Sequence, residues 1–421
     1  MKLTRTLGVD RKEVTGNRFR LVHNDCVPEL MDWADNCIDG MVLTSIPFGN
    51  QYEYCASLND FGHNPSNEEF FAQMDFMVPH LHRVLQPGRI AAVHVKDRIR
   101  FGNVTGFAVP TVEPFSDHTT AAFTKHGFKL LARITVDTDV VRENNQTYRL
   151  GWTEVCKDGT KMGAGMPEYV LIFRKLPTSL DNAYADVPVT KEKASYGLAE
   201  WQTDAAGLWR SSGDRLPDPE ILQHMGLDAI KRLWIDYSLK GGYDYREHVA
   251  LARKLEKKGK LPSSFMLFPP ISRNPDIWTD ITRMKTLNTK QAQKGAEKHV
   301  CPLQLDIIER LIRRYSNEGE IVYDPFMGIG SVAWQALKMK RKAWGTELNE
   351  EYWRFSVGYA EAVEAEMDLP TLFDLARPET VTVRGTPTEE VQPPEWLAQN
   401  NLGTADAGKK KRKITKPKQI S

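Results

Sequence analysis

Short apolar runs and helix-spaced apolar positions alternate along most of this chain. Residues 90–95 and 169–173 are almost entirely apolar, which predicts buried strands. Residues 67–84 place apolar side chains three and four positions apart, as in a helix that packs on one side. Strands that alternate with helices indicate an α/β fold whose sheet is mostly parallel.

The same pattern extends over two long stretches of the chain. Helices are predicted at 27–33, 67–84, 119–125, 302–315, 332–339 and 350–366. Strands are predicted at 19–23, 38–44, 90–95, 129–136, 169–173, 321–323 and 343–346.

The chain divides where this pattern changes. Residues 1–175 and 299–376 are predicted to form the two parts of one α/β domain. Residues 176–298 hold scattered helical segments, including 219–238 and 245–258, among turn signals, which predicts an inserted region. Residues 377–421 are predicted to be disordered, because so few apolar side chains cannot offset the entropy of ordering.

The composition narrows the class of protein. The 421 residues are 41% apolar and 26% charged, as in soluble globular proteins. No apolar run reaches the ~18 residues that cross a bilayer, and the N-terminal stretch lacks the apolar core of a signal peptide. Five cysteines without a CxxC pair favour a reduced, cytoplasmic setting over disulfides or a zinc site.

The positive charge is concentrated in two segments. The whole chain carries a net charge of only +1, yet residues 409–421 hold seven Lys or Arg and no acid. Residues 231–298 hold fifteen Lys or Arg against seven Asp or Glu. Such local excesses suit contacts with nucleic-acid phosphates.

A glycine turn joins a strand to a helix in residues 321–347, IVYDPFMGIGSVAWQALKMKRKAWGTE. Gly328 and Gly330 can take conformations closed to other residues and bring the backbone close to a ligand at a helix N-terminus. Glu347 ends the next strand, where nucleotide-type sites hold ribose hydroxyls. On its own, this pattern leaves a plain tight turn equally open.

Two longer strings carry a family resemblance. DPFMGIGS, residues 324–331, resembles motif I, the DPFxGxGT loop with which the DNA amino-methyltransferases bind S-adenosylmethionine. SIPF, residues 45–48, follows a strand and resembles motif IV of that family, (D/N/S)PP(Y/F). Motif IV before a long insert and motif I after it is the circularly permuted order of the β group. The resemblance covers residues 19–175 and 298–366.

This resemblance implies both a fold and an activity. The fold is a Rossmann-like, seven-stranded α/β methyltransferase domain, circularly permuted, with a target-recognition region inserted at 176–298. The activity transfers a methyl group from S-adenosylmethionine to the exocyclic amine of a base flipped out of double-stranded DNA. A bacterial or phage enzyme of this kind is cytoplasmic, has no membrane partner, and is free-standing or paired with a cognate restriction enzyme.

The implied catalytic loop consists of Ser45, Ile46, Pro47 and Phe48. The Ser45 hydroxyl and the Ile46 carbonyl can accept both hydrogens of the base amine, which points its lone pair at the methyl donor. Phe48 can stack on the flipped base. Ile46 stands where the family has its first proline, so we expect a less restrained backbone at that position.

The implied cofactor site draws on several motifs. Asn24-Asp25 resembles the motif whose acid approaches the cofactor adenine, and 298–302 resembles motif X. No metal site is predicted: His23, His63, His80, His82 and His94 lack metal-ligand spacing and are expected to be structural or solvated. The cofactor-binding residues are then Asp25, His299, Asp324, Pro325, Phe326, Gly328, Gly330, Ser331 and Glu347.

Several functions stay open at this point. Serine at the first position of motif IV resembles the N4-cytosine group, so cytosine N4 is favoured over adenine N6. Related loops also serve methyltransferases that act on RNA or on protein amides, and Ile46 motivates a DNA-binding protein with a degenerate methyltransferase fold. An oxidoreductase is disfavoured because no GxGxxG follows the strand: Ser331, Val332 and Ala333 come after Gly330.

Overall fold

The structure is a computed structural model of the 421-residue chain. The predicted disordered tail and the cofactor residue His299 lie outside the residues that it describes. Those residues are 8–49, 53–100, 105–107, 111–137, 156, 158, 167–197, 201, 219–240, 245–261, 276–279, 281, 285–287 and 302–368.

Two sheets occur in the described part of the chain. The small one pairs β5 (Arg98–Arg100) with β6 (Thr111–Glu113). The large one contains β1 (Lys12–Thr15), β2 (Phe19–His23), β3 (Met41–Ser45), β4 (Ile90–Lys96), β7 (Lys129–Val136), β8 (Glu168–Arg174), β9 (Ile277–Trp278), β10 (Ile321–Asp324) and β11 (Lys342–Glu347).

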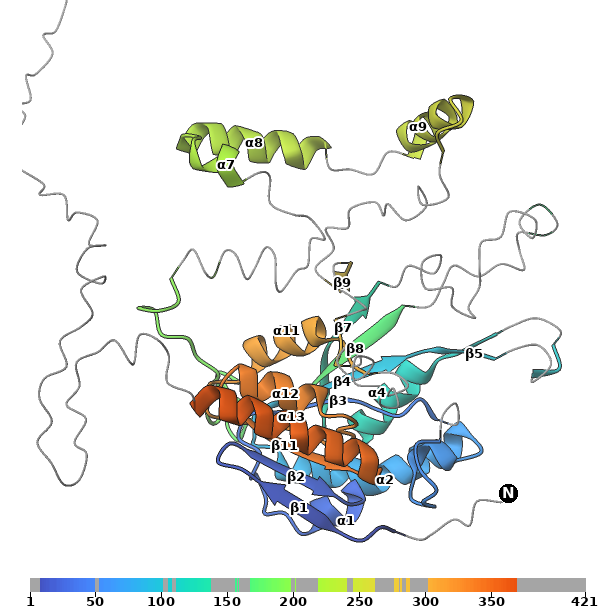
Figure 1. The fold of residues 1–421 in the computed structure, drawn as a ribbon, viewed down its shortest axis with the longest axis vertical. Helices are drawn as coiled ribbons and strands as arrows, with labels where there is room; N and C mark the ends of the chain where they lie inside the picture. The colour runs from blue at the N-terminus through green and yellow to red at the C-terminus, as the bar shows by residue number, and fades with distance from the viewer. Residues whose placement is uncertain are drawn as a thin grey trace, which may run out of the picture. The chain divides into compact units, whose positions relative to one another are not determined.

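The large sheet has the strand order β1-β2-β11-β10-β3-β4-β8-β7-β9 (Figure 1). From β2 to β4 every neighbouring pair is parallel. β8 runs antiparallel to both of its neighbours, β4 and β7, and β1 runs antiparallel to β2. The result is a mixed α/β fold with a mostly parallel sheet, as expected.

All the predicted strands occur within three residues of their expected bounds, and two more extend the sheet at its edges. β1 escaped prediction because its residues, KEVT, are mostly exposed and carry no apolar run. β9 is only two residues long, yet its Trp278 is buried and pairs beside Val136 of β7. Residues 277–278, although inside the predicted insert, therefore complete the main sheet.

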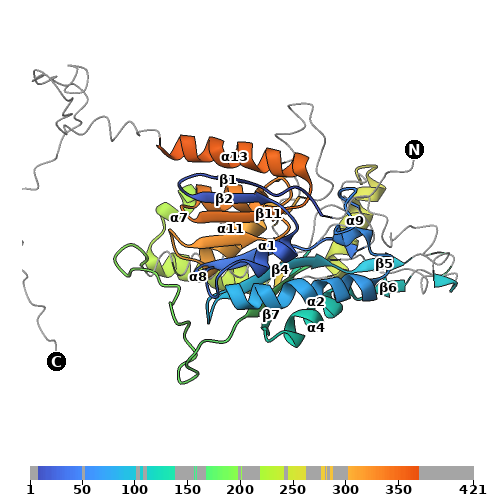
Figure 2. The same ribbon diagram turned by 90° about the horizontal axis from the view of Figure 1, so that it is seen from below.

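Helices cover both faces of this sheet (Figure 1 and Figure 2). One face packs against α11 (Leu305–Tyr315), α12 (Ser331–Lys338) and α13 (Glu350–Asp368). The other packs against α1 (Cys26–Met31), α2 (Asn67–Val84) and α4 (Phe115–Lys125). The predicted insert contributes α7 (Pro219–Gln223), α8 (Leu227–Lys240) and α9 (Tyr245–Lys257). Among the described helices, none has the length and apolarity of a bilayer span.

Strand β3 shows why the central strands read as continuous apolar runs. Side chains of a strand point alternately to its two faces. Met41 and Leu43 accordingly join the core beneath α11, α12 and α13, whereas Val42 joins the core beneath α1, α2 and α4. Both faces of a central parallel strand are buried, so both sets are mostly apolar.

Two glycines provide a matched test of this packing. An added Cβ at Gly40, just before β3, would overlap the backbone carbonyl of Ile321 in β10, so Gly40→Ala should destabilise the fold by about 1–3 kcal/mol. Gly358 lies exposed in α13 with open space around it, so Gly358→Ala should stabilise by about 0.5–1 kcal/mol. Denaturant unfolding measures both changes; a destabilised Gly358→Ala or a neutral Gly40→Ala would contradict this account.

Candidate functional site

The parallel strands bring both predicted loops to one edge of the sheet. Val322 and Tyr323 of β10 pair with Met41 and Val42 of β3, so the loops after Ser45 and after Asp324 leave adjacent strand ends. A cavity that opens to solvent lies at this edge, and its empty space, open solvent included, is about 880 Å³. Among the predicted site residues that the structure describes, all but Gly330 line it: Asp25, Ser45, Ile46, Pro47, Phe48, Asp324, Pro325, Phe326, Gly328, Ser331 and Glu347.

Left-handed glycines shape the turn between β10 and α12. Gly328 has φ +54° and Gly330 has φ +86°, which other residues rarely adopt. A Cβ at Gly330 would lie 2.7 Å from the Cβ of Ser356 in α13. Gly330 therefore lets the turn lie against α13, while Gly328 and Ser331 border the cavity.

Glu347 ends β11 and supports this turn. Its Oε2 accepts the backbone N–H of Gly328 over 2.7 Å, and its Oε1 accepts that of Asn349 over 2.8 Å. Burial raises the pKa of Glu347 to about 7, although both backbone donors oppose the shift. Each carboxylate oxygen keeps a further lone pair, so the side chain can still accept a hydroxyl from a ligand.

Asp324 is the second buried acid at this edge. Its Oδ1 accepts the backbone N–H of Phe326 over 3.0 Å, which fixes the first bend of the turn. Burial raises the pKa of Asp324 to about 7. The negative charges of Asp324 and Glu347 also disfavour one another.

Two residues that the sequence did not single out, Asn59 and Asp60, complete the acidic side of the cavity. Asp60 accepts three backbone N–H groups, and burial raises its pKa. The side-chain amide of Asn59 donates to Oδ2 of Asp25 over 2.5 Å. Neither residue stands in a regular pattern, so only the three-dimensional placement of residues 53–64 could reveal them.

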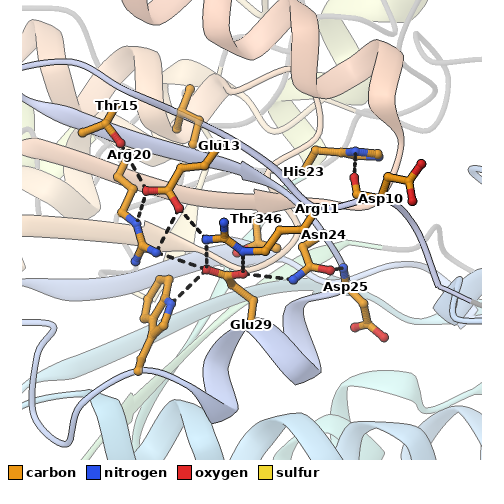
Figure 3. A network of polar contacts seen from close by, with 12 residues as sticks. Asp10, Arg11, Glu13, Thr15, Arg20, His23, Asn24, Asp25, Glu29 and Thr346 are labelled. Atoms are coloured by element: carbon orange, nitrogen blue, oxygen red, sulfur yellow. Dashed lines mark hydrogen bonds and ion pairs between the residues drawn. The ribbon is translucent and has the colours of Figure 1, made fainter.

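A polar network holds Asp25 in place (Figure 3). Asn24 occupies the glycine position of the resembled motif; its Oδ1 accepts the backbone N–H of Asp25 over 2.9 Å, and its Nδ2 donates to Glu29 over 2.9 Å. Arg11 donates to the same buried carboxylate over 2.8 Å. Asp25 also caps α1 by accepting the backbone N–H of Val27. The side chain of Asn24 thus supplies a restraint that glycine could not.

The loop after β3 is restrained differently from our expectation. Ile46 is buried, and its backbone N–H donates to the carbonyl of His94 in β4 over 3.3 Å. Proline has no N–H to donate, so isoleucine replaces a ring restraint by a backbone hydrogen bond. Arg98 Nη1 in β5 donates to the carbonyl of Phe48 over 2.8 Å, which holds the far end of the loop.

His94, expected to be only structural or solvated, contacts the loop directly. Its Nδ1 lies 2.9 Å from Ser45 Oγ, and its Nε2 lies 3.0 Å from Glu168 Oε2. Sequence patterns missed both residues, because only the antiparallel return of β8 brings Glu168 to this edge. Within the described residues, no group of His, Cys, Asp and Glu has a metal-binding arrangement.

Known proteins match this chain over several ranges. The family model described as DNA methylase matches residues 40–358. The type II methyltransferase M.ScaI of Streptomyces caespitosus is 30% identical over 109 residues, which are 25% of this chain and 33% of that protein. M1.MboII of Moraxella bovis is 44% identical over 99 residues, 23% and 37% of the two chains. The aligned segments therefore span only about a third of these relatives.

Two solved structures resemble the chain more widely but more weakly. TTHA0409 from Thermus thermophilus, solved with S-adenosyl-L-methionine, is 19% identical with a TM-score of 0.44, covering 83% of this chain and 95% of that one. The cytosine-N4-specific PvuII DNA methyltransferase is 13% identical with a TM-score of 0.46, covering 83% and 92%. The family model carries the assignment, since both structural likenesses are low in identity and score.

Replacing Asp324 by Asn should stabilise the ligand-free protein at neutral and alkaline pH. Burial raises the pKa of Asp324 from 3.8 to about 7, so the folded protein keeps a proton that the unfolded chain releases. Wild-type stability therefore falls as pH rises through this range, by at most about 4 kcal/mol, and the neutral Asn escapes that loss. Denaturant unfolding across the range should show an advantage of Asp324→Asn that grows with pH and levels off above about pH 7. A difference that is independent of pH would contradict the assignment.

Proposed function

This chain belongs to the N6/N4 DNA methylase family, and on that premise we propose that it transfers a methyl group from S-adenosylmethionine to an exocyclic base amine of double-stranded DNA. One observation supports this most: the serine loop after β3 and the glycine turn after β10 border the same cavity. A methyl donor on one loop and an amine on the other would then meet at the edge of the sheet. The circularly permuted order of the two loops is part of this proposal.

The cavity residues fit S-adenosylmethionine. Glu347 keeps lone pairs for ribose hydroxyls. Asp25 and Asn59 also line the cavity, and the hydrogen bond between their side chains holds Asp25 in place there. Asp324 and Asp60 are carboxyl groups in the cavity wall, and their ionised forms would attract a ligand that carries positive charge on sulfur and on its amino group. When bound, the cofactor supplies an electrophilic methyl group. The predicted contact with His299 stays a prediction.

The serine loop fits an exocyclic amine. Ser45 Oγ and the carbonyl of Ile46 accept the two amine hydrogens, which directs the nitrogen lone pair away from the loop and toward the methyl donor. Phe48 stacks on the flipped base, while Arg98 holds the backbone carbonyl of Phe48 by a hydrogen bond. In the proposed transfer, the amine nitrogen would bond to the methyl carbon as the bond between that carbon and the cofactor sulfur breaks, and the amine would release one proton to solvent. No covalent enzyme intermediate is needed, so positioning would carry the rate.

Cytosine N4 is the favoured acceptor and adenine N6 the runner-up. The support is Ser45 at the first position of the loop. The predicted insert, residues 176–298, would recognise the target sequence, since residues 231–298 carry the basic excess that suits phosphate contacts. A cognate restriction enzyme as partner stays a prediction.

Sequencing that detects modified bases, applied to DNA from cells that express the protein, tests the activity and identifies the base. Transfer of labelled methyl to duplex DNA, RNA and protein, measured in parallel, separates the substrate classes. Modified cytosine in DNA alone is the expected result. Transfer only to RNA or protein, or cofactor binding without transfer, would overturn the proposal.

Ser45→Ala and Phe48→Ala should each lower activity without unfolding the protein. Loss of base stacking at Phe48 costs about 1–3 kcal/mol, so kcat/KM should fall about tenfold to a hundredfold. Phe76→Ala is the matched control, because this exposed phenylalanine lies on α2 outside the cavity. Equal losses in Phe48→Ala and Phe76→Ala would remove Phe48 from the site.

Glu347→Ala should weaken cofactor binding. Hydrogen bonds to a charged acceptor are worth about 1.5–3 kcal/mol, so the Kd for S-adenosylmethionine should rise about tenfold to a hundredfold. Titration calorimetry measures this change. Glu350→Ala is the control, because its partly exposed carboxylate pairs with Lys12 and Arg354 outside the cavity. An unchanged Kd would exclude Glu347 from the cofactor site.

A further inference from the structure

We propose that His94 and Glu168 are positioning residues that make Ser45 a hydrogen-bond acceptor toward the cavity. This proposal rests on the proposed function for its consequence, but its geometry is independent of it. The three side chains come from three adjacent strands, β3, β4 and β8, and Ser45 is the direct neighbour of His94 in the ladder. They form a continuous chain of short contacts that ends at the cavity.

His94 and Glu168 are too deeply buried for water to replace either of them as a hydrogen-bond partner. His94 and Glu168 are only 4% and 5% exposed. Ser45 lies at the boundary, with its loop in the cavity wall. The buried side chains of His94 and Glu168 therefore orient the hydroxyl of Ser45, which lies at the surface of the cavity.

The chemistry of Glu168 determines where the hydrogens lie. A carboxylate only accepts, so the 3.0 Å contact requires a hydrogen on Nε2 of His94. Lys96 Nζ lies 3.7 Å from the other carboxylate oxygen and gives the acid a cationic partner. In neutral imidazole the second nitrogen, Nδ1, then carries a lone pair.

The hydroxyl of Ser45 must complement that lone pair. Nδ1 accepts, so the Ser45 O–H donates to it over 2.9 Å. The hydrogen of Ser45 is thereby directed into the protein, and the oxygen lone pairs are left for the cavity. Glu168 thus selects the tautomer of His94, in the same way that a buried acid orients a catalytic imidazole elsewhere.

This orientation discriminates between substrates. A ligand edge that donates N–H, such as the amine of cytosine or adenine, matches an oxygen that only accepts. A ligand edge that presents a carbonyl, such as the O4 edge of thymine, faces two acceptors and is disfavoured. His94 and Glu168 would thus select an amine although neither touches it.

The tautomer can be read directly. Nitrogen-15 NMR of protein labelled in its 10 histidines distinguishes Nε2–H, Nδ1–H and doubly protonated rings, and His94→Asn assigns the signal. We expect Nε2–H in the ligand-free wild type at neutral pH. In Glu168→Gln the amide can donate to Nε2, which permits the Nδ1–H tautomer. A wild-type ring protonated on Nδ1 would overturn the proposal.

Kinetics show whether the effect passes through Ser45. Glu168→Gln should lower kcat for duplex DNA about tenfold to a hundredfold and leave the Kd for S-adenosylmethionine unchanged. In a Ser45→Ala background the same change should cost nothing further, because its target is gone. Equal losses in both backgrounds would show a structural role and overturn the proposal.

Glu320→Gln provides the matched control. This acid also bonds within the core, to Arg89, but it precedes β10 and lies at the opposite end of that strand from the cavity. Its variant should keep the wild-type kcat. If wild type transfers no methyl group to DNA, the proposed function fails, whereas the NMR measurement still decides the tautomer.

Discussion

The parallel pairing of β3 with β10 is the constraint on which the site depends. These strands come from opposite ends of the folded chain, so their pairing closes a very long loop, and the apolar burial of both faces must offset that entropy. Parallel pairing aligns strand ends of the same polarity. The Ser45 loop and the Asp324 turn therefore become neighbours when β3 and β10 pair.

The acids at this edge show what such a site costs the ligand-free fold. Asp324 and Glu347 are buried and accept hydrogen bonds from uncharged backbone N–H groups, and burial raises the pKa of both to about 7. These backbone donors compensate only part of the desolvation. A fold optimised for stability alone would place neutral side chains here, and this cost makes the two carboxyl groups candidates for ligand binding.

The sequence could predict the strands and both loops, but not the residues that hold them. Apolar runs are local signals, and DPFMGIGS and SIPF are contiguous strings, so each can be recognised from the sequence alone. Asp60 and Asn59 act through an irregular segment, and Glu168 reaches His94 only because β8 returns antiparallel beside β4. Their roles depend on long-range register, which no local periodicity encodes.

Ile46 shows how the same physics corrects an expectation based on residue type alone. Compared with a proline, isoleucine frees one backbone dihedral, but it also supplies an N–H that reaches the carbonyl of His94. The side chain of that histidine contacts Ser45, so β4 holds the loop through both its backbone and its imidazole. Strand β4, instead of a proline ring within the loop, therefore restrains the loop. Isoleucine at position 46 is thus compatible with a well-positioned Ser45.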